Sequence, residues 1–75
     1  MSIKPFLHGA HFDPRHVEAM GLAFDKVTEA LDGKAVSRVV REVIATKIIA
    51  LAKTGERDPD KLCELTLNTL GVTLP

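Results

Sequence analysis

The chain has few residues that carry chemistry of their own. Its 75 residues include one cysteine, so no disulfide can form within it, and a lone thiol is typical of a reducing compartment. Tryptophan and tyrosine are absent and phenylalanine occurs three times, so the core must be built mainly from aliphatic side chains. Ten cations balance ten carboxylates, which leaves the chain without the strongly basic surface of a nucleic-acid-binding domain.

Long apolar runs are also missing. No segment approaches the ~20 apolar residues that a membrane-spanning helix needs, and the first twelve residues lack the apolar core of a secretory signal. We therefore expect a cytoplasmic protein with no membrane partner. A single domain of this length has a thin core, which a disulfide, a metal or a partner subunit normally reinforces.

Two Asp-Pro pairs mark the starts of helices. In Asp13-Pro14 and Asp58-Pro59 the aspartate suits an N-cap, and proline is tolerated at the first helical position because its missing N–H would be unpaired there. Apolar residues at spacings of three and four follow the first pair, as on one face of a helix. These residues are Val17, Met20, Phe24, Val27 and Leu31.

The whole pattern predicts an all-α fold, a small three-helix up-down-up bundle. We expect helices at about 13–32, 35–54 and 58–70, with Gly33 and Gly55 ending the first two. The domain would span 12–71, after an N-terminal arm of residues 1–11 and before a tail of residues 72–75. The inner face predicted for the third helix is Leu62, Leu65, Thr69 and Leu70.

The second helix is apolar on two faces, and one of them predicts an interface. Its first half brings four valines together, and its second half is apolar on a face rotated by roughly a third to a half turn. Because three short helices cannot cover both faces, we expect a homodimer, or a different protein partner, to complete the core. The interface candidates are Leu22, Val36, Val39, Val40 and Val43, and the candidate rim for a partner is Lys34, Arg38 and Arg41.

Several polar residues allow more than one interpretation. The three rim cations form either a binding stripe or a solvated helix face. Lys47 falls among apolar positions, so it extends to the rim, pairs with a carboxylate such as Glu18, or marks a ligand pocket. His8, His11 and His16 are spaced with Asp13 as metal ligands could be, but Asp13 is already used as an N-cap, so no metal is expected.

Neither a catalytic nor a cofactor site is indicated. The chain has no glycine-rich phosphate loop and no catalytic triad spacing, so we expect no enzyme activity and no cofactor. Cys63 is interpreted as a buried structural thiol. The charged stretch "KTGERDPDK", residues 53–61, is interpreted as the corner between the second and third helices, in which Glu56 and Arg57 have no structural role.

A DNA-binding helix-turn-helix formed by the second and third helices is the alternative. Its recognition helix would begin Asp58-Pro59-Asp60 and would carry Lys61 as its one cation, so two carboxylates would face the DNA phosphates. We therefore expect a small non-enzymatic helical protein that acts through protein–protein contact, as a homodimer or as a regulatory or adaptor subunit.

Three blocks of the sequence resemble a group of short, uncharacterised bacterial helical proteins. The blocks are Phe12-Asp13-Pro14, Ala23-Phe24 and the run from Ile48 to Leu62, which follows the pattern I-I-x-L-A-x-x-G-E-R-D-P-x-x-L. The similarity covers most of the chain, and the last block is its most specific part. It implies a compact helical protein that stands alone, and it implies no activity or catalytic residue.

Overall fold

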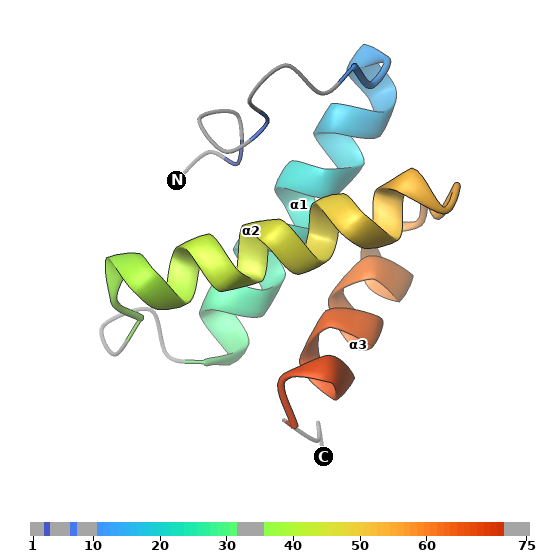
Figure 1. Cartoon of the computed structure of the whole chain (residues 1–75). Helices are drawn as coiled ribbons and strands as arrows, with labels where there is room; N and C mark the ends of the chain where they lie inside the picture. Colours follow the sequence, from blue (N-terminus) through green and yellow to red (C-terminus); the bar gives the residue numbers. More distant parts are fainter. Residues whose placement is uncertain (1–2, 4–6, 8–10, 32–35, 72–75) are drawn as a thin grey trace.

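The chain forms three helices. A computed structural model describes residues 3, 7, 11–31 and 36–71, and all statements about structure refer to these (Figure 1). Helix α1 spans Pro14–Ala30, α2 spans Arg38–Lys53 and α3 spans Pro59–Thr69. The described residues contain no strand. The predicted all-α, three-helix fold is confirmed.

Each helix begins at a side chain that accepts a hydrogen bond from a backbone N–H of the first turn. Asp13 accepts from His16 N at 2.9 Å and Asp58 accepts from Asp60 N at 3.0 Å. Both act as the N-caps expected from the Asp-Pro pairs. Ser37 is the third cap, accepting from Val40 N at 3.2 Å.

The serine cap explains where α2 starts. Because the Ser37 backbone is extended, with φ −73° and ψ 168°, the helix begins at Arg38 instead of near residue 35. Gly33, which we expected to end the first helix, lies in the segment 32–35 outside the described residues.

Glycines follow the ends of α2 and α3. Gly55 has φ +103° and Gly71 has φ +77°, in the left-handed region that other residues rarely adopt. The Gly55 N–H donates to the carbonyl of Ala52 at 3.0 Å, which satisfies one of the free carbonyls of the last turn. Lys53, also in that turn, places a cation at the negative end of the helix dipole.

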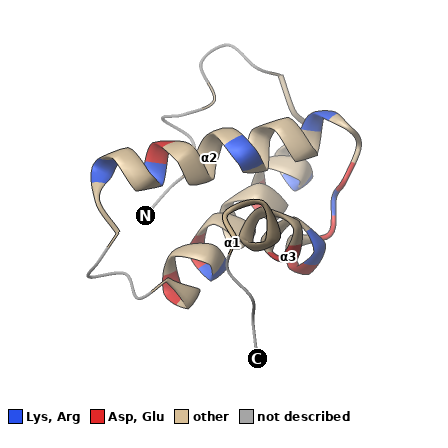
Figure 2. Cartoon of the chain, turned by 60° about the horizontal axis from the view of Figure 1, so that its bottom comes forward, with Lys and Arg blue, Asp and Glu red and all other residues tan. Residues whose placement is uncertain are grey.

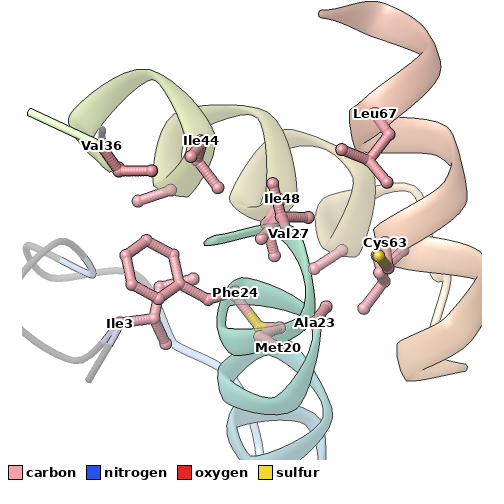
Figure 3. Packing of buried hydrophobic residues seen from close by; sticks show 13 residues of the cluster. Ile3, Met20, Ala23, Phe24, Val27, Val36, Ile44, Ile48, Cys63 and Leu67 are labelled. Carbon is pink, nitrogen blue, oxygen red and sulfur yellow. The ribbon is translucent and has the colours of Figure 1, made fainter. Parts of the chain in front are cut away.

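The helices form two layers. In Figure 1 α2 crosses α1, and α3 runs away from beneath the C-terminal end of α2; in Figure 2 α2 lies above both other helices. All three pairs of helices are in contact. The core lies between the layers, as Figure 3 shows. Its fully buried members include Met20, Phe24, Val27, Ile44, Ile48 and Leu62.

The N-terminal segment supplies part of this core. Ile3 is 1 % exposed and lies beside Phe24 in Figure 3, and Leu7 packs against the core while half-buried. Two described residues of the predicted arm, Ile3 and Leu7, therefore pack against the helices. Because Ile3 is an isolated apolar residue and belongs to no repeating apolar pattern, the sequence does not predict that it is buried.

The buried face of α3 differs from the predicted one. Leu62 is buried as expected, but Thr69 is exposed and Leu65 and Leu70 are half-buried. The remaining buried residues of α3 are Cys63, Thr66 and Leu67. Because two other helices contact α3, its buried arc is wider than a single stripe of leucines and includes a thiol and a hydroxyl.

The described helices have no membrane-spanning segment, since none combines the length and the hydropathy that crossing a bilayer requires.

Candidate functional site

The side of α2 that faces away from α1 and α3 carries exposed valines. Val39, Val40 and Val43 are 69, 37 and 41 % exposed, whereas Ile44 and Ile48 are fully buried on the inner side of the same helix. We call the residues Val39, Glu42, Val43, Thr46 and Lys47 the outer face of α2. These five line a shallow, open hollow of about 370 Å³. The outer face is thus the apolar surface that the fold leaves uncovered.

Val36 does not belong to this surface. The sequence interpretation grouped it with the other valines, but it is 6 % exposed and lies in the core. The reason is that Val36 precedes the Ser37 cap, so its side chain does not follow the helical periodicity of α2. Figure 3 shows it pointing toward the core beside Ile44.

Two polar members of the outer face have partners within α2. The Thr46 hydroxyl donates to the Glu42 carbonyl at 2.8 Å, which leaves its methyl group available to a partner. The Glu42 carboxylate lies 3.8 Å from Nε of Arg38, one turn earlier. A surface that covers Thr46 therefore need not supply a hydrogen bond to its hydroxyl. The Glu42 carboxylate and the Lys47 ammonium group must stay at the edge of such a contact, in water.

Lys47 is exposed. It forms no ion pair within the described part of the chain, so the alternative in which it pairs with Glu18 is not observed. The position among apolar residues is on the uncovered side of α2, where the ammonium group remains in water. Of the alternatives considered from sequence, the structure favours a lysine at the rim of an open hollow.

The candidate rim is only partly assembled. Lys34 lies outside the described residues. Arg38 is exposed and pairs with Glu42, whereas Arg41 is half-buried and donates from Nη1 to the carbonyl of Val36 at 3.2 Å. Arg41 therefore holds the segment before α2 in place.

Leu22 lies apart from the exposed valines. It is 47 % exposed on α1, the helix against which the inner side of α2 packs. The predicted interface residues that are exposed thus lie on two separate surfaces, and Leu22 provides a matched control for substitutions on α2.

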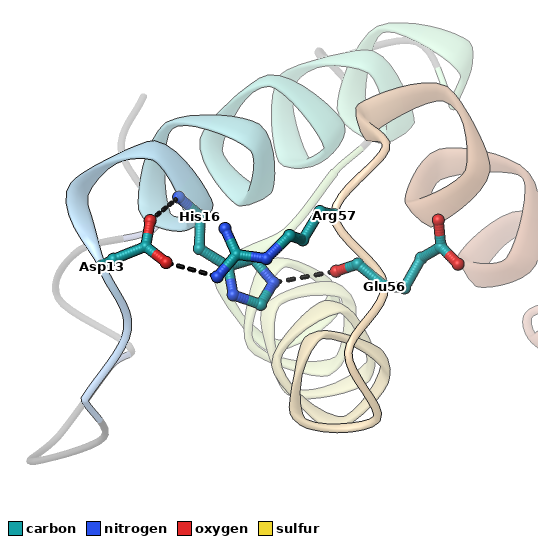
Figure 4. Close-up of polar contacts among 4 residues, drawn as sticks. All are labelled: Asp13, His16, Glu56 and Arg57. Atoms are coloured by element: carbon teal, nitrogen blue, oxygen red, sulfur yellow. Dashed lines mark hydrogen bonds and ion pairs between the residues drawn. The ribbon is translucent and has the colours of Figure 1, made fainter.

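A second polar cluster joins the start of α1 to the loop between α2 and α3 (Figure 4). The Asp13 carboxylate forms an ion pair with Arg57, and this hydrogen bond, together with the one from the His16 N–H, lowers the pKa of Asp13 to about 2. The His16 ring donates from Nε2 to the carbonyl of Glu56 at 2.8 Å. The ring of Phe12 packs edge-on against His16 with centroids 5.0 Å apart.

These contacts correct the interpretation of the loop. Glu56 and Arg57 were expected to have no structural role, yet both bind the first turn of α1. The sequence could not show this, because the partners lie 40 and 44 residues away. The rest of the stretch acts as the predicted corner, with Gly55 ending α2 and Asp58 capping α3.

Two of the residues that could have formed a metal site are bound to other groups. His16 bonds to Glu56, Asp13 to Arg57, and His11 is exposed, while His8 lies outside the described residues. In the segments that can be described, no three His, Cys, Asp or Glu side chains are grouped as metal ligands.

Cys63 is buried in the core, as expected. Burial raises the pKa of its thiol, which keeps the thiol protonated and unreactive at neutral pH.

Close by, Lys26 of α1 pairs with Asp60 of α3 at 3.1 Å, and this hydrogen bond raises the pKa of Lys26. This part of the molecule is thus a helix–helix contact.

Comparisons of the chain with protein-family models, curated proteins and solved structures find no match.

Proposed function

We propose that this protein acts without catalysis, by binding another polypeptide on the outer face of α2. The observation that carries the proposal is that Val39 and Val43 of the outer face, with Val40 beside them, are exposed on a helix whose opposite side is buried. Single exposed apolar residues are ordinary, but grouped ones mark interaction surfaces. Covering each half-exposed valine contributes on the order of 1 kcal/mol to binding.

This function suits a homodimer or a regulatory or adaptor subunit, and it suits the cytoplasm. The core of a 75-residue chain is small, so burying the outer face also adds to the stability of each subunit. One buried free thiol is compatible with a reducing compartment.

The helix-turn-helix alternative has no such support. A recognition helix places its N-terminal residues in the major groove of DNA. Here the start of α3 carries Asp58, the cap, and Asp60, the partner of Lys26. Both carboxylates would approach the phosphates, and the exposed Lys61 alone offers little compensation.

The proposal is tested by recovering partners from the native cell with tagged wild-type protein and two variants. The Val39→Glu/Val43→Glu double variant places charges on the outer face, and Leu22→Glu places one on the exposed side of α1. All three sites are exposed, so we expect the variants to fold, which circular dichroism verifies.

We expect a partner that wild type and Leu22→Glu retain and that the double variant loses. That partner is either a second copy of the chain or a different protein. The proposed function would be overturned if all three forms retained the same proteins. It would also be overturned if none of the three forms retained a partner.

A further inference from the structure

We propose that the polypeptide bound by the outer face of α2 is a second copy of this chain, with the two α2 helices packed antiparallel about a two-fold axis. The inference rests on the proposed function, because it names the partner for that face. It is carried by the spacing, size, charge and hydrogen bonding of the exposed residues of α2.

The exposed residues form a seam with the spacing of a two-helix contact. Val39, Val43, Thr46 and Ala50 are all exposed and follow one another at intervals of four, three and four residues. Alternation of four and three keeps side chains on one narrow line along a helix, which is the pattern by which two helices pack against each other. No charged residue lies in this seam.

The seam is complementary to itself in the antiparallel direction. With the axis placed midway between residues 44 and 45, Val39 of one copy faces Ala50 of the other, and Val43 faces Thr46. The Val39–Ala50 layer then combines a larger with a smaller side chain, and the Val43–Thr46 layer combines two side chains of nearly equal size that both present methyl groups. A parallel pair would instead place Val39 on Val39 and Ala50 on Ala50, which leaves a gap at the alanines.

The flanks of the seam are compatible with this arrangement. Val40 and Lys47 lie on the same side of the seam, seven residues apart. In the antiparallel pair, Val40 of one copy is level with residue 49 of the other. Lys47 is two residues from that level, which is about 3 Å along the axis. Its aliphatic stem can cover that valine while the ammonium group stays in water.

Charge and hydrogen bonding also favour a second copy over a charged partner. The outer face carries one carboxylate, Glu42, and one ammonium group, Lys47, so it is neutral and selects neither an acidic nor a basic protein. The Thr46 hydroxyl already donates to the Glu42 carbonyl, so pairing leaves no polar group of the seam unsatisfied.

The seam is short, so the dimer is weak. From Val39 to Ala50 it measures about 17 Å at 1.5 Å per residue. Stable interfaces bury about 800 Å² on each partner, more than four small side chains provide. We therefore expect a dissociation constant on the order of 100 μM and rapid exchange between monomer and dimer.

Disulfide trapping tests the arrangement with the full-length chain. Val39→Cys and Ala50→Cys proteins are mixed at about the expected dissociation constant, and formation of the three disulfide-linked dimers is followed under mild oxidation. In the antiparallel pair the two residues 39 lie about 17 Å apart along the axis, whereas residue 39 lies level with residue 50 of the other copy. Cysteines at such separation cannot be bridged.

We expect the 39–50 disulfide to form at least tenfold faster than the 39–39 and 50–50 disulfides, with the preference abolished in denaturant. Wild type controls for Cys63, which is buried and should remain unlinked. Val43→Cys mixed with Thr46→Cys is a second pair. Because the two residues 43 are separated by only about 4.5 Å along the axis, we expect the mixed disulfide to be favoured here too, but by less than for residues 39 and 50.

Other outcomes would overturn this inference. Fast 39–39 and 50–50 disulfides would show a parallel pair, and equal, slow rates for all three would show that the copies do not dock through α2. If the rates are slow while a different protein is retained through the outer face in the cell, the proposed function stands and the second copy is the wrong partner. If the mixed disulfide is not favoured and no protein is retained through the outer face in the cell, both proposals are wrong.

Discussion

Arg57 in the loop between α2 and α3 forms an ion pair with Asp13, the residue that caps α1. The pair fixes the start of α1 to a loop that lies 44 residues further along the chain. The neighbouring Glu56 carbonyl accepts the hydrogen bond from His16, so two adjacent loop residues hold the same turn of α1 (Figure 4). The contacts of Glu56 and Arg57 in this loop therefore serve the fold.

The Asp13–Arg57 pair should make stability depend on pH in the acid range. The folded pKa of Asp13 is lowered to about 2, below the ordinary value of about 3.9 in an unfolded chain. A lowered folded pKa contributes stability that is fully present above the unfolded pKa and is lost as the pH falls through the folded pKa. We expect Arg57→Gln to be less stable than wild type at pH 7, and the difference to shrink between about pH 4 and pH 2.

Urea midpoints of both proteins, measured from pH 7 to pH 2, check this expectation. Arg15→Gln is the matched control, because Arg15 is an exposed cation of α1 with no ion pair among the described residues. A gap between wild type and Arg57→Gln that stays constant down to pH 2 would show that Arg57 acts on stability through something other than Asp13.

His16 should contribute through its hydrogen bond as well as its packing. His16→Phe keeps a ring against Phe12 but leaves the Glu56 carbonyl without its donor, so we expect a loss of about 1–2 kcal/mol in the free energy of unfolding. Chemical denaturation measures the loss. His11→Phe, at an exposed position, should change stability by less than about 0.5 kcal/mol. Equal effects of the two substitutions would contradict the assigned hydrogen bond.

Thr66 should be a site where a single substitution stabilises the protein. Its side chain is fully buried and Oγ1 has no hydrogen-bond partner among the residues that the structure describes. A buried hydroxyl without a partner costs about 1–3 kcal/mol, and valine has nearly the same shape. We expect Thr66→Val to raise the free energy of unfolding by about 1 kcal/mol.

Thr28→Val is the matched control for that substitution. Thr28 is also buried, but its hydroxyl donates to the Asp25 carbonyl at 2.9 Å, so the same change removes a hydrogen bond. We expect Thr28→Val to lower stability, by about 1 kcal/mol or less. Thermal melts of the two variants should move in opposite directions; a Thr66→Val protein that melts below wild type would show that the hydroxyl is satisfied in solution.

Asp58, the N-cap of α3, should stabilise the protein through its side chain. Asp58→Ala removes the acceptor for the Asp60 N–H and should cost about 1 kcal/mol, whereas Asp58→Asn keeps an acceptor and should cost only a few tenths. Urea denaturation of the two variants measures both losses. If the alanine and asparagine variants were equally stable, the side chain of Asp58 would not be capping α3.

Local signals predicted much of this fold, and long-range contacts account for what they missed. Asp13, Asp58 and Gly55 act within one turn of their own positions, so their roles follow from the residue type and its neighbours. The ion pair of Arg57 depends on how two distant segments meet, and no spacing rule contains that information.

Burial shows the same division between local and long-range information. The exposed Val39 and the buried Val36 differ because Ser37 begins the helix between them, a boundary that the run of valines obscures. The sequence therefore predicts that α2 has a group of valines on one face, but it does not predict that Val36 is missing from the exposed group.

The proposed pairing of two copies through the outer face of α2 can be measured by sedimentation equilibrium from about 10 μM to about 1 mM, on wild type and on the Val39→Glu/Val43→Glu variant. We predict that the mean mass of wild type rises from 8.2 kDa toward twice that value across this range, while the variant stays at 8.2 kDa. A wild-type protein that remains at 8.2 kDa at the highest concentration, or a variant that associates as strongly as wild type, would contradict it.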